Sequence, residues 1–295
     1  MSKSKVAVVR SEYYDFLKNL REAVDLAGGI GPGGKRSVAI KVNLCDCRPP
    51  ETGAITHPAS LDCLLEYLRE TLGDLPIYVV ESNATMSRPN LLIEWFGFTR
   101  ILKRWNAEWH NLSEERTHKK DINGRRFRSV KVPVILDESL VINLSKLKTH
   151  SLTKISCSLK NQYGCIPFSR KIRFHKFLDD AIVDANVAMP PDFCIVDGVI
   201  AMGGTQGPAL GVPLHKRLLV AGKDPVAVDS ACARVMRFNP YFIGHVRKAW
   251  EAGVGSRNYE LLGQKLETVS SDFEFSRLDH LPLRVARIVR RWTRA

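Results

Sequence analysis

The residue types best suited to chemistry follow an apolar run at 139–144, which predicts a buried strand. Cations, hydroxyls and one imidazole crowd directly after this run. They are Lys146, Lys148, Thr149, His150, Ser151, Lys154, Lys160 and Asn161. Ligands of α/β proteins bind beyond the carboxyl ends of the strands, so the cluster indicates an anion-binding active site. A solvated basic loop is the alternative.

Four residues are the catalytic candidates. His150 is the first choice for proton transfer, because an imidazole titrates near neutral pH and adjacent lysines favour its neutral, basic form. His175 is the second choice, and Lys148 lies next to His150 in the same cluster. Asp197 follows a predicted strand and could orient a histidine, bind a cation or act as an acid or base. A metal site built from His150, His175 and Asp197 has no supporting local spacing.

Other predicted strands also end in polar groups, which we interpret as substrate ligands. An ammonium and an amide at the end of the 37–42 strand could hold an oxyanion. A glycine-rich loop at 197–208 follows a strand and could cradle a phosphate or carboxylate, with a purely conformational loop as the equal alternative. The substrate-binding candidates are Lys41, Asn43, Ser82, Lys160, Asn161, Gly204, Gly207 and Asp224. Asp224 could instead simply cap the helix that follows it.

The glycine-rich stretch at 28–34 is interpreted as a helix stop and a connection. It follows a predicted helix and precedes a strand, whereas phosphate loops follow a strand and open a helix. The sequence has no Walker A motif, no nucleophile elbow and no Rossmann glycine fingerprint after the first strand. The 12–27 helix is expected to be capped by Ser11, and His57 is either a cap, a packing residue or a ligand contact.

Seven cysteines at uneven spacing suit reduced thiols rather than a disulfide framework. Cys63, Cys194 and Cys232 are expected in the core. Cys45 and Cys47 form a C-x-C pair in a predicted loop and are the candidate metal ligands. An iron–sulfur cluster or another metal is an open alternative for the cofactor, but the chain has no cluster-binding cysteine run.

The formal charge of +13 implies an anionic partner, and it is concentrated at 125–128, 170–176 and 284–294. Aromatic residues do not interleave with these runs, so nucleic acid is the less favoured partner. The 281–295 segment predicts a basic amphipathic helix that packs on its own domain or a partner, or else meets a membrane surface or polyanion. No membrane-spanning run or signal peptide is apparent, so a cytoplasmic location is expected.

The order of elements predicts an α/β fold: a Rossmann-like layered sheet, mostly parallel, with helices on both faces and an inserted polar and basic excursion. Strands are expected at 5–9, 37–42, 76–80, 107–112, 139–144, 193–196 and 218–221. Helices are expected at 12–27, 59–72, 90–96, 100–105, 179–189, 226–236, 247–253 and 259–262. A hairpin with a type I′ turn at Asn123-Gly124 is expected within 113–132. We expect one domain at 1–280, with an inserted subdomain at about 113–180 as the alternative.

The motifs, taken in order, resemble the DUF362 family over about residues 35–255. They are KVN from Lys41, THP from Thr56, VES from Val80, KLKTH from Lys146, SLKN from Ser158 with Gly164, His175, IVDG from Ile195, GP from Gly207 with Gly211, and DPVAVD from Asp224. The resemblance implies an α/β protein of poorly defined activity that is often fused to, or encoded near, ferredoxin-type iron–sulfur modules. The chain departs from fused members in lacking their cysteine run.

The sequence and the resemblance together predict an enzyme that acts on a small carboxylated or phosphorylated metabolite. A redox step is the leading reaction class, with electrons from a separate iron–sulfur protein or another donor. Two alternatives come from other classes. One is a non-catalytic polyanion or nucleic-acid binder, and the other is an accessory subunit that docks an acidic ferredoxin through its basic faces.

Overall fold

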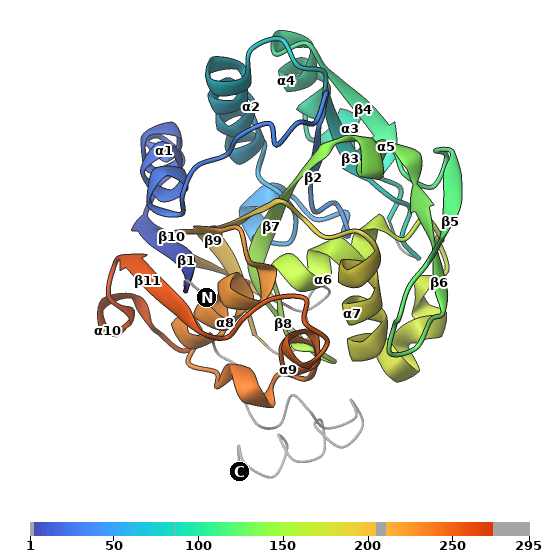
Figure 1. Ribbon diagram of the computed structural model, residues 1–295. Coiled ribbons are helices and arrows are strands. Elements are labelled where there is room, and N and C mark those ends of the chain that lie inside the picture. The colour runs from blue at the N-terminus through green and yellow to red at the C-terminus, as the bar shows by residue number, and fades with distance from the viewer. Residues whose placement is uncertain (1–2, 86, 205–210, 274–295) are drawn as a thin grey trace, which may run out of the picture.

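A nine-stranded sheet organises the computed structural model, which describes residues 3–85, 87–204 and 211–273. The strand order is β11-β1-β10-β9-β7-β2-β3-β4, and β8 pairs with β7 off this path (Figure 1). The strands are β1 (Ser4–Arg10), β2 (Val38–Lys41), β3 (Ile77–Glu81), β4 (Ala107–Asn111), β7 (Leu140–His150), β8 (Lys154–Ser156), β9 (Phe193–Gly203), β10 (Val212–Gly222) and β11 (Tyr259–Gly263).

The centre of the sheet is parallel: β9, β7, β2, β3 and β4 all pair in that sense. β10 is antiparallel to both of its neighbours, β9 and β1, and β11 lies parallel to β1 on the other side. The chain runs outward from β2 to β3 and β4, then returns to β7 on the opposite side of β2. The boundary between β2 and β7 is therefore a topological switch point, where open α/β sheets bind ligands.

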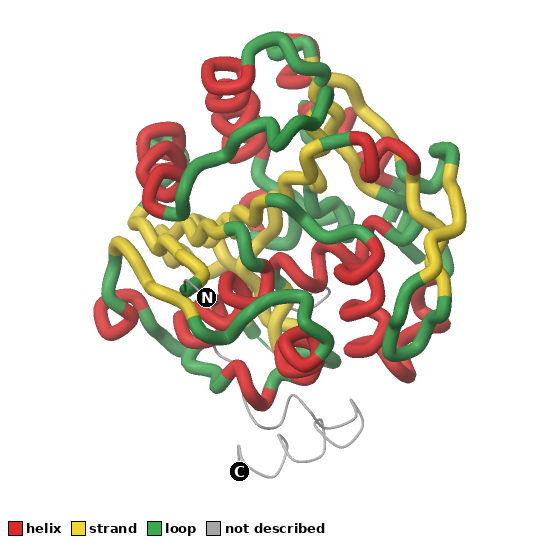
Figure 2. Tube along the Cα trace, in the orientation of Figure 1, coloured by secondary structure: helices red, strands yellow, loops and turns green. Residues whose placement is uncertain are grey.

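Helices cover both faces of the sheet, as Figures 1 and 2 show. The helices are α1 (Phe16–Leu26), α2 (Pro58–Leu72), α3 (Pro89–Trp95), α4 (Phe98–Arg104), α5 (Val134–Glu138), α6 (Ser158–Gln162), α7 (Leu178–Ala188), α8 (Pro225–Val235), α9 (Gly244–Glu251) and α10 (Leu266–Val269). One apolar cluster joins the sheet to α1, α2, α3 and α4, and the other joins it to α6, α7, α8 and α9. The mostly parallel α/β architecture predicted from the sequence is confirmed.

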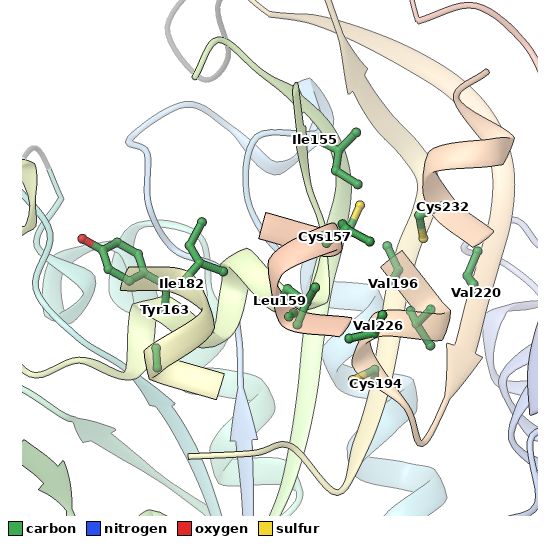
Figure 3. Close-up of a cluster of buried hydrophobic side chains, with 14 of the residues drawn as sticks. Ile155, Cys157, Leu159, Tyr163, Ile182, Cys194, Val196, Val220, Val226 and Cys232 are labelled. Carbon is green, nitrogen blue, oxygen red and sulfur yellow. The ribbon is translucent and has the colours of Figure 1, made fainter. Parts of the chain in front are cut away.

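Three cysteines belong to the apolar layer under α6 and α8. Cys157, Cys194 and Cys232 lie among Val196, Val226 and other aliphatic side chains (Figure 3). All three are buried, and burial raises the pKa of each thiol. A thiol held neutral in an apolar layer acts as a small hydrophobic side chain. The core assignment of Cys194 and Cys232 is confirmed, whereas Cys63 is half-buried.

Two strands are longer than the sequence predicts. β7 continues through the residues that were expected to form a loop, so Lys146, Lys148 and Thr149 lie on the strand itself. β9 likewise runs through Asp197, which was expected to follow it. Both predicted strands end before the first charged residue, because an isolated charge is not expected in a buried strand. Here Lys146 and Asp197 form an ion pair on neighbouring strands, and this pairing lets both strands continue.

Other local predictions need correction. The 259–262 segment is the strand β11, because it pairs with β1. The hairpin in the 113–132 region consists of β5 (Thr117–Asp121) and β6 (Ser129–Pro133), as expected, but a loop at 122–128 joins them in place of a two-residue turn. Backbone N–H groups of Arg125, Arg126 and Phe127 in that loop donate to the Asp184 carboxylate.

The first helix begins at Phe16, and Asp15 occupies the N-cap position in place of Ser11. The predicted helix at 281–295 lies outside the described residues. Among the helices that are described, none is long and apolar enough to cross a membrane. The single-domain organisation and the cytoplasmic location stay predictions.

Candidate functional site

A cavity of about 260 Å³ opens beside the switch point between β2 and β7. Its walls come from the carboxyl ends of β2 and β3, the end of β7, and α6 with the turns that follow it. Eight of the predicted site residues line it: Lys41, Asn43, Cys45, Ser82, Lys148, His150, Lys160 and Asn161, and His175 joins them from the 3-10 turn η3 (Lys171–Phe177). The clustering predicted from strand-exit positions is therefore present in the folded chain.

All three donors of the Lys41 ammonium are hydrogen-bonded to neighbouring protein groups. Its side chain is fully buried, and its Nζ lies 2.9 Å from Glu81 Oε2, 2.6 Å from the Val42 carbonyl and 3.3 Å from Asn161 Oδ1. Glu81 also accepts from the backbone N–H groups of Leu44 and Ser82. The pair forms the floor of the cavity, and an ammonium with three acceptors has no donor left for a substrate.

Gly164 brings the turn after α6 against this pair. A Cβ on Gly164 would lie 2.7 Å from Lys41 Nζ and 3.0 Å from Glu81 Oε1. Only glycine allows such a close approach of backbone to a buried ion pair. Glu81 was absent from the predicted site, although its position as the last residue of a buried strand, paired in space with Lys41, is a usable signal.

Lys148 is also held by protein groups. Its Nζ donates to Asn43 Oδ1 and to the Ala54 carbonyl, both at 2.7 Å, and lies 3.5 Å from Cys45 Sγ. Asn43 Nδ2 in turn donates to Asn161 Oδ1 at 3.0 Å. This network fixes the loop after β2 to β7 and α6. Lys148 therefore forms a wall of the cavity and raises its positive potential.

Lys160 differs from the other two lysines. It lines the cavity from α6, and its ammonium has no hydrogen bond or ion pair to any described residue. Its pKa is lowered to about 8, mainly by burial, with a smaller opposing effect of Cys45 and a smaller lowering effect of the charge of Lys148. A partly buried cation without a protein partner gains the most from an anionic ligand.

His150 presents one particular nitrogen to the site. Its Nδ1 accepts from the backbone N–H groups of Leu152, at 3.2 Å, and Thr153, at 3.4 Å. Burial, followed by the charges of Lys160 and Lys148, holds the pKa of His150 well below its ordinary value. The neutral imidazole that the sequence predicted is present, but the amides engage its lone pair. Nε2 then carries the proton and acts as a hydrogen-bond donor.

His175 is exposed and reaches the cavity from η3. Its pKa is lowered, first by burial and then by the charge of Lys160. It is the more exposed of the two predicted histidines that line the cavity. That position suits exchange of protons with solvent.

Lys171 is a site residue that the sequence reasoning missed. In the sequence it is part of the basic run at 170–176, yet its side chain is buried and its Nζ donates to Ser82 Oγ, to the Asn83 carbonyl at 3.1 Å and to the Gly164 carbonyl at 3.2 Å. Burial lowers its pKa to about 8. Ser82, predicted as a substrate ligand, also donates to the Gly164 carbonyl, so it joins Lys171 in closing one end of the cavity.

Asp197 does not join His150. Its carboxylate lies 3.0 Å from Lys146 Nζ and accepts from Tyr13 Oη at 3.1 Å, and both charged side chains are fully buried. The His57 ring stacks on Tyr13 at 3.7 Å between centroids. Asp197 is outside the cavity lining, so its predicted catalytic role has no support from the geometry. The sequence could not show that Lys146 faces away from Lys160.

The remaining predicted ligands have structural partners. Asp224 caps α8 by accepting from the backbone N–H groups of Val226 and Ala227, which confirms the alternative stated for it. Gly204 donates its N–H to the Phe273 carbonyl and accepts from Thr149 Oγ1. Gly207 lies outside the described residues. His57 caps α2 by accepting from the Ala59 N–H.

A buried aspartate, Asp229, binds the N-terminal backbone of α6. Asp229 accepts from the backbone N–H groups of Ser158 at 2.8 Å and Leu159 at 3.1 Å, at the start of the helix that carries Lys160. Burial raises its pKa to about 7. His245 lies 3.9 Å from Asp229 Oδ2 and 3.7 Å from Asp179 Oδ1, and it is fully buried. These groups position α6 and do not line the cavity.

The candidate metal ligands are not assembled into a cluster. Cys45 is half-buried beside Lys148, and Cys47 is exposed. The described residues contain no group of three or more histidine, cysteine, aspartate or glutamate side chains able to hold a metal ion. Cys45 and Cys47 as a metal site thus stay a sequence prediction that the local donor set does not support.

The comparisons with known proteins include one protein that is similar in sequence and one solved structure that superposes on this chain. The chain is 26% identical over 260 residues to the thylakoid-associated protein sll1697 of Synechocystis sp. PCC 6803. The aligned region covers 80% of this chain and 75% of that protein. The lactate racemase apoprotein from Thermoanaerobacterium thermosaccharolyticum superposes with a TM-score of 0.49 at 13% identity, covering 80% of this chain and 57% of that one.

The family comparison agrees with the motifs. The model of the domain of unknown function DUF362 matches residues 38–234, a range that runs from β2 into α8 and includes every element of the cavity wall. The resemblance predicted from the KVN, KLKTH and SLKN motifs is confirmed, and the chain belongs to the DUF362 family.

Proposed function

We propose that this chain is an enzyme that binds a small carboxylated or phosphorylated metabolite in the cavity between β2 and β7 and catalyses proton transfer on it. Lys160 holds the anionic group of the substrate. His150 donates a hydrogen bond from Nε2 to an oxygen of the substrate, and His175 exchanges protons with solvent.

The unpartnered ammonium of Lys160 carries this proposal. Four other lysines near the cavity or on β7, Lys41, Lys146, Lys148 and Lys171, are hydrogen-bonded to protein acceptors. Lys160 is the one whose charge the described residues leave uncompensated, and it faces a cavity large enough for a small metabolite. With a pKa of about 8, it is also close to neutral pH, where a lysine can both bind an anion and move a proton.

His150 supports the same reading. A neutral imidazole with Nδ1 fixed by two amides is a rigid hydrogen-bond donor at Nε2. Such a donor stabilises negative charge that develops on a substrate oxygen without first losing a proton. This role replaces the general-base role expected from the sequence.

The direct test is binding of small anions to a Lys160→Met variant. Titration calorimetry with a panel of short carboxylates and phosphate esters identifies a ligand of the wild-type chain. We expect Lys160→Met to lower the affinity for that ligand by about 10- to 100-fold, the range for a lost hydrogen bond to a charged group. Lys176→Met is the matched control, because it removes the same charge from an exposed position on η3. Equal effects of the two substitutions would refute the proposal.

The redox step stays a prediction from the family resemblance, and its test is independent of Lys160. Metal analysis and an absorption spectrum of protein purified without oxygen check it directly. Iron with a visible absorption band would support electron transfer, while colourless, metal-free and active protein would assign the activity to acid–base chemistry. Docking of an acidic ferredoxin on the basic run at 170–176 would use Arg170 and Arg173, which are exposed, whereas Lys171 is buried.

The polyanion-binding alternative makes a different prediction. Binding carried by the overall charge of +13 would fall steeply with salt and would not depend on Lys160. A titration of single-stranded and double-stranded nucleic acid at two salt concentrations separates this alternative from a cavity-bound metabolite.

A further inference from the structure

A second cleft, of about 390 Å³, lies between α8, α9 and the loop before β11. Its lining contains two guanidinium groups, those of Arg234 and Arg257, and no carboxylate. The remaining lining residues are Ser230, Asn239, Pro240, Tyr241, Trp250, Ser256 and Asn258. None of them lines the cavity between β2 and β7, so the two spaces are separate.

The two arginines have no acidic partner within the described part of the chain. Arg257 packs its guanidinium on the Trp250 ring, 3.5 Å from the centroid, and lies 5.3 Å from the centroid of Tyr241. Arg234 lies 5.7 Å from the centroid of the Tyr259 ring. Stacking on aromatic faces fixes the position of a guanidinium and leaves its N–H groups free to donate.

Three buried polar atoms around the cleft have no hydrogen-bond partner. They are Ser230 Oγ, Arg257 Nε and Tyr259 Oη. Ser230 is fully buried on α8 and lines the cleft. Buried donors are seldom left unpaired, because they lose their bonds to water without regaining them. A hydroxyl and a guanidinium N–H at the same cleft both lack a hydrogen-bond partner. Together they indicate a missing acceptor.

The acids nearest to Ser230 and Arg234 in sequence are occupied elsewhere. Asp224 accepts from the N-terminal amides of α8 and from the Ser256 N–H, and Asp229 accepts from the start of α6. Neither lines the cleft. The local charge is therefore positive and can accept an anion without displacing a protein carboxylate.

We propose that this cleft is a second anion site that binds a phosphate group, free or as part of a phosphate ester. Arg257 and Arg234 donate to the phosphate oxygens, and Ser230 Oγ adds a hydroxyl donor. Two guanidinium groups match the charge of a phosphate dianion, and the planar fork of each suits two of its oxygens. The site is independent of the metabolite cavity and of the reaction proposed there.

The experiment titrates inorganic phosphate into the full chain carrying Lys160→Met, so that the metabolite cavity does not contribute. Calorimetry at constant ionic strength should report one binding event. Adding Arg257→Gln should weaken it about tenfold or more, the effect expected for a charged hydrogen-bond donor. Arg247→Gln is the matched control, because Arg247 is on α9 beside the cleft but is paired with Glu251. It should leave the affinity unchanged.

Two results of this titration would overturn the proposal. Equal weakening by Arg257→Gln and Arg247→Gln would mean that phosphate is attracted by the general positive charge. Absence of binding in the Lys160→Met background would mean that the cleft takes no phosphate. Because the wild-type chain is titrated in parallel, failure at the cleft remains distinguishable from failure of the metabolite cavity. Acetate added to the same solution should not compete with phosphate for the cleft, since a single planar carboxylate would leave one of the donors unpaired.

Loss of folding must be separated from loss of binding. Arg234→Gln provides the second variant, because Arg234 is exposed and its replacement leaves the Arg257–Trp250 stack intact. It should also lower phosphate affinity while the thermal unfolding midpoint stays that of the parent. Unchanged affinity in Arg234→Gln together with an altered midpoint in Arg257→Gln would overturn the proposal, because Arg234 would take no part in binding and the effect of Arg257 would come from the fold.

Discussion

Two lysines near the centre of the sheet, Lys146 and Lys160, show opposite solutions to burying a positive charge. Lys146 on β7 is fully buried against Asp197, and its Nζ also lies 3.3 Å from Tyr13 Oη. Lys160 on α6 has no partner among the described residues and faces a cavity. Burial is the largest influence on the pKa of both, and it lowers both. The comparison teaches that the presence of a partner, rather than burial, separates a lysine that holds the fold from one available for a ligand.

The sharpest test of this difference is the stability of a Lys146→Met variant. Removing Lys146 leaves Asp197 buried and unpaired, so the free energy of unfolding should fall by about 3–5 kcal/mol. Urea unfolding measures the change. Adding Asp197→Leu should restore part of the loss, because two apolar residues replace the broken pair. A Lys146→Met variant as stable as the wild type would show that the pair does not hold β7 to β9.

The pH dependence of ligand binding tests the other half of the comparison. Lys160 must be protonated to hold an anion, and its pKa is about 8. Affinity should be constant below pH 8 and fall about tenfold per pH unit above it, until the pKa of the bound form is reached. The same titration with Lys160→Met should be flat. If the variant keeps the wild-type slope, Lys171, whose pKa is also about 8, is the group that titrates.

Replacement of His150 distinguishes a hydrogen-bond donor from a base. A glutamine at this position can still donate an N–H, whereas a phenylalanine cannot. We expect His150→Phe to weaken ligand binding by about tenfold and His150→Gln to remain within a few-fold of the wild type. Equal losses of binding in the two variants would remove the donor role from His150.

The smallest expected effect is the loss of folding stability caused by burying the charge of Lys160. Its pKa is about 8 in the folded chain, against an ordinary lysine value of 10.5, so the folded state disfavours the charged form. The destabilisation is complete below pH 8 and disappears as the pH rises through 10.5. Lys160→Met should therefore be more stable than the wild type at pH 7, by about 1 kcal/mol or less because the side chain is partly solvated. The gain should vanish near pH 11, as followed by thermal unfolding.

The sequence predicted the parts of the site that depend on strand ends. Lys41, Asn43 and Ser82 each follow or close a buried apolar run, and parallel strands bring such ends to one edge. The motif-based resemblance also predicted the family. Periodicity alone did not predict the length of β7, because a run containing Lys146 and Lys148 does not resemble a buried strand until Asp197 and Asn43 are known to lie opposite.

Partnerships between distant residues are the part that the sequence could not supply. Nothing local separates Lys160, without a partner, from Lys41, with three acceptors, since Glu81 and Asn161 come from other elements. The same limit explains Lys171, which was assigned to a basic surface run and is buried under Ser82. The arginine cleft was missed because Arg234 and Arg257 meet only when β11 returns to the sheet.

The position of β1 has a consequence for how the chain reaches its fold. β1 is synthesised before the other strands of this sheet, yet both of its neighbours, β10 and β11, come from the other end of the described chain. Contacts between such distant segments form slowly, because a long loop must close first. The family match at 38–234 contains neither β1 nor β11, so β10 would be an open edge within that range alone. During synthesis the ribosome must release most of the chain before β1 meets either partner, and until then β1 is available to pair with another molecule.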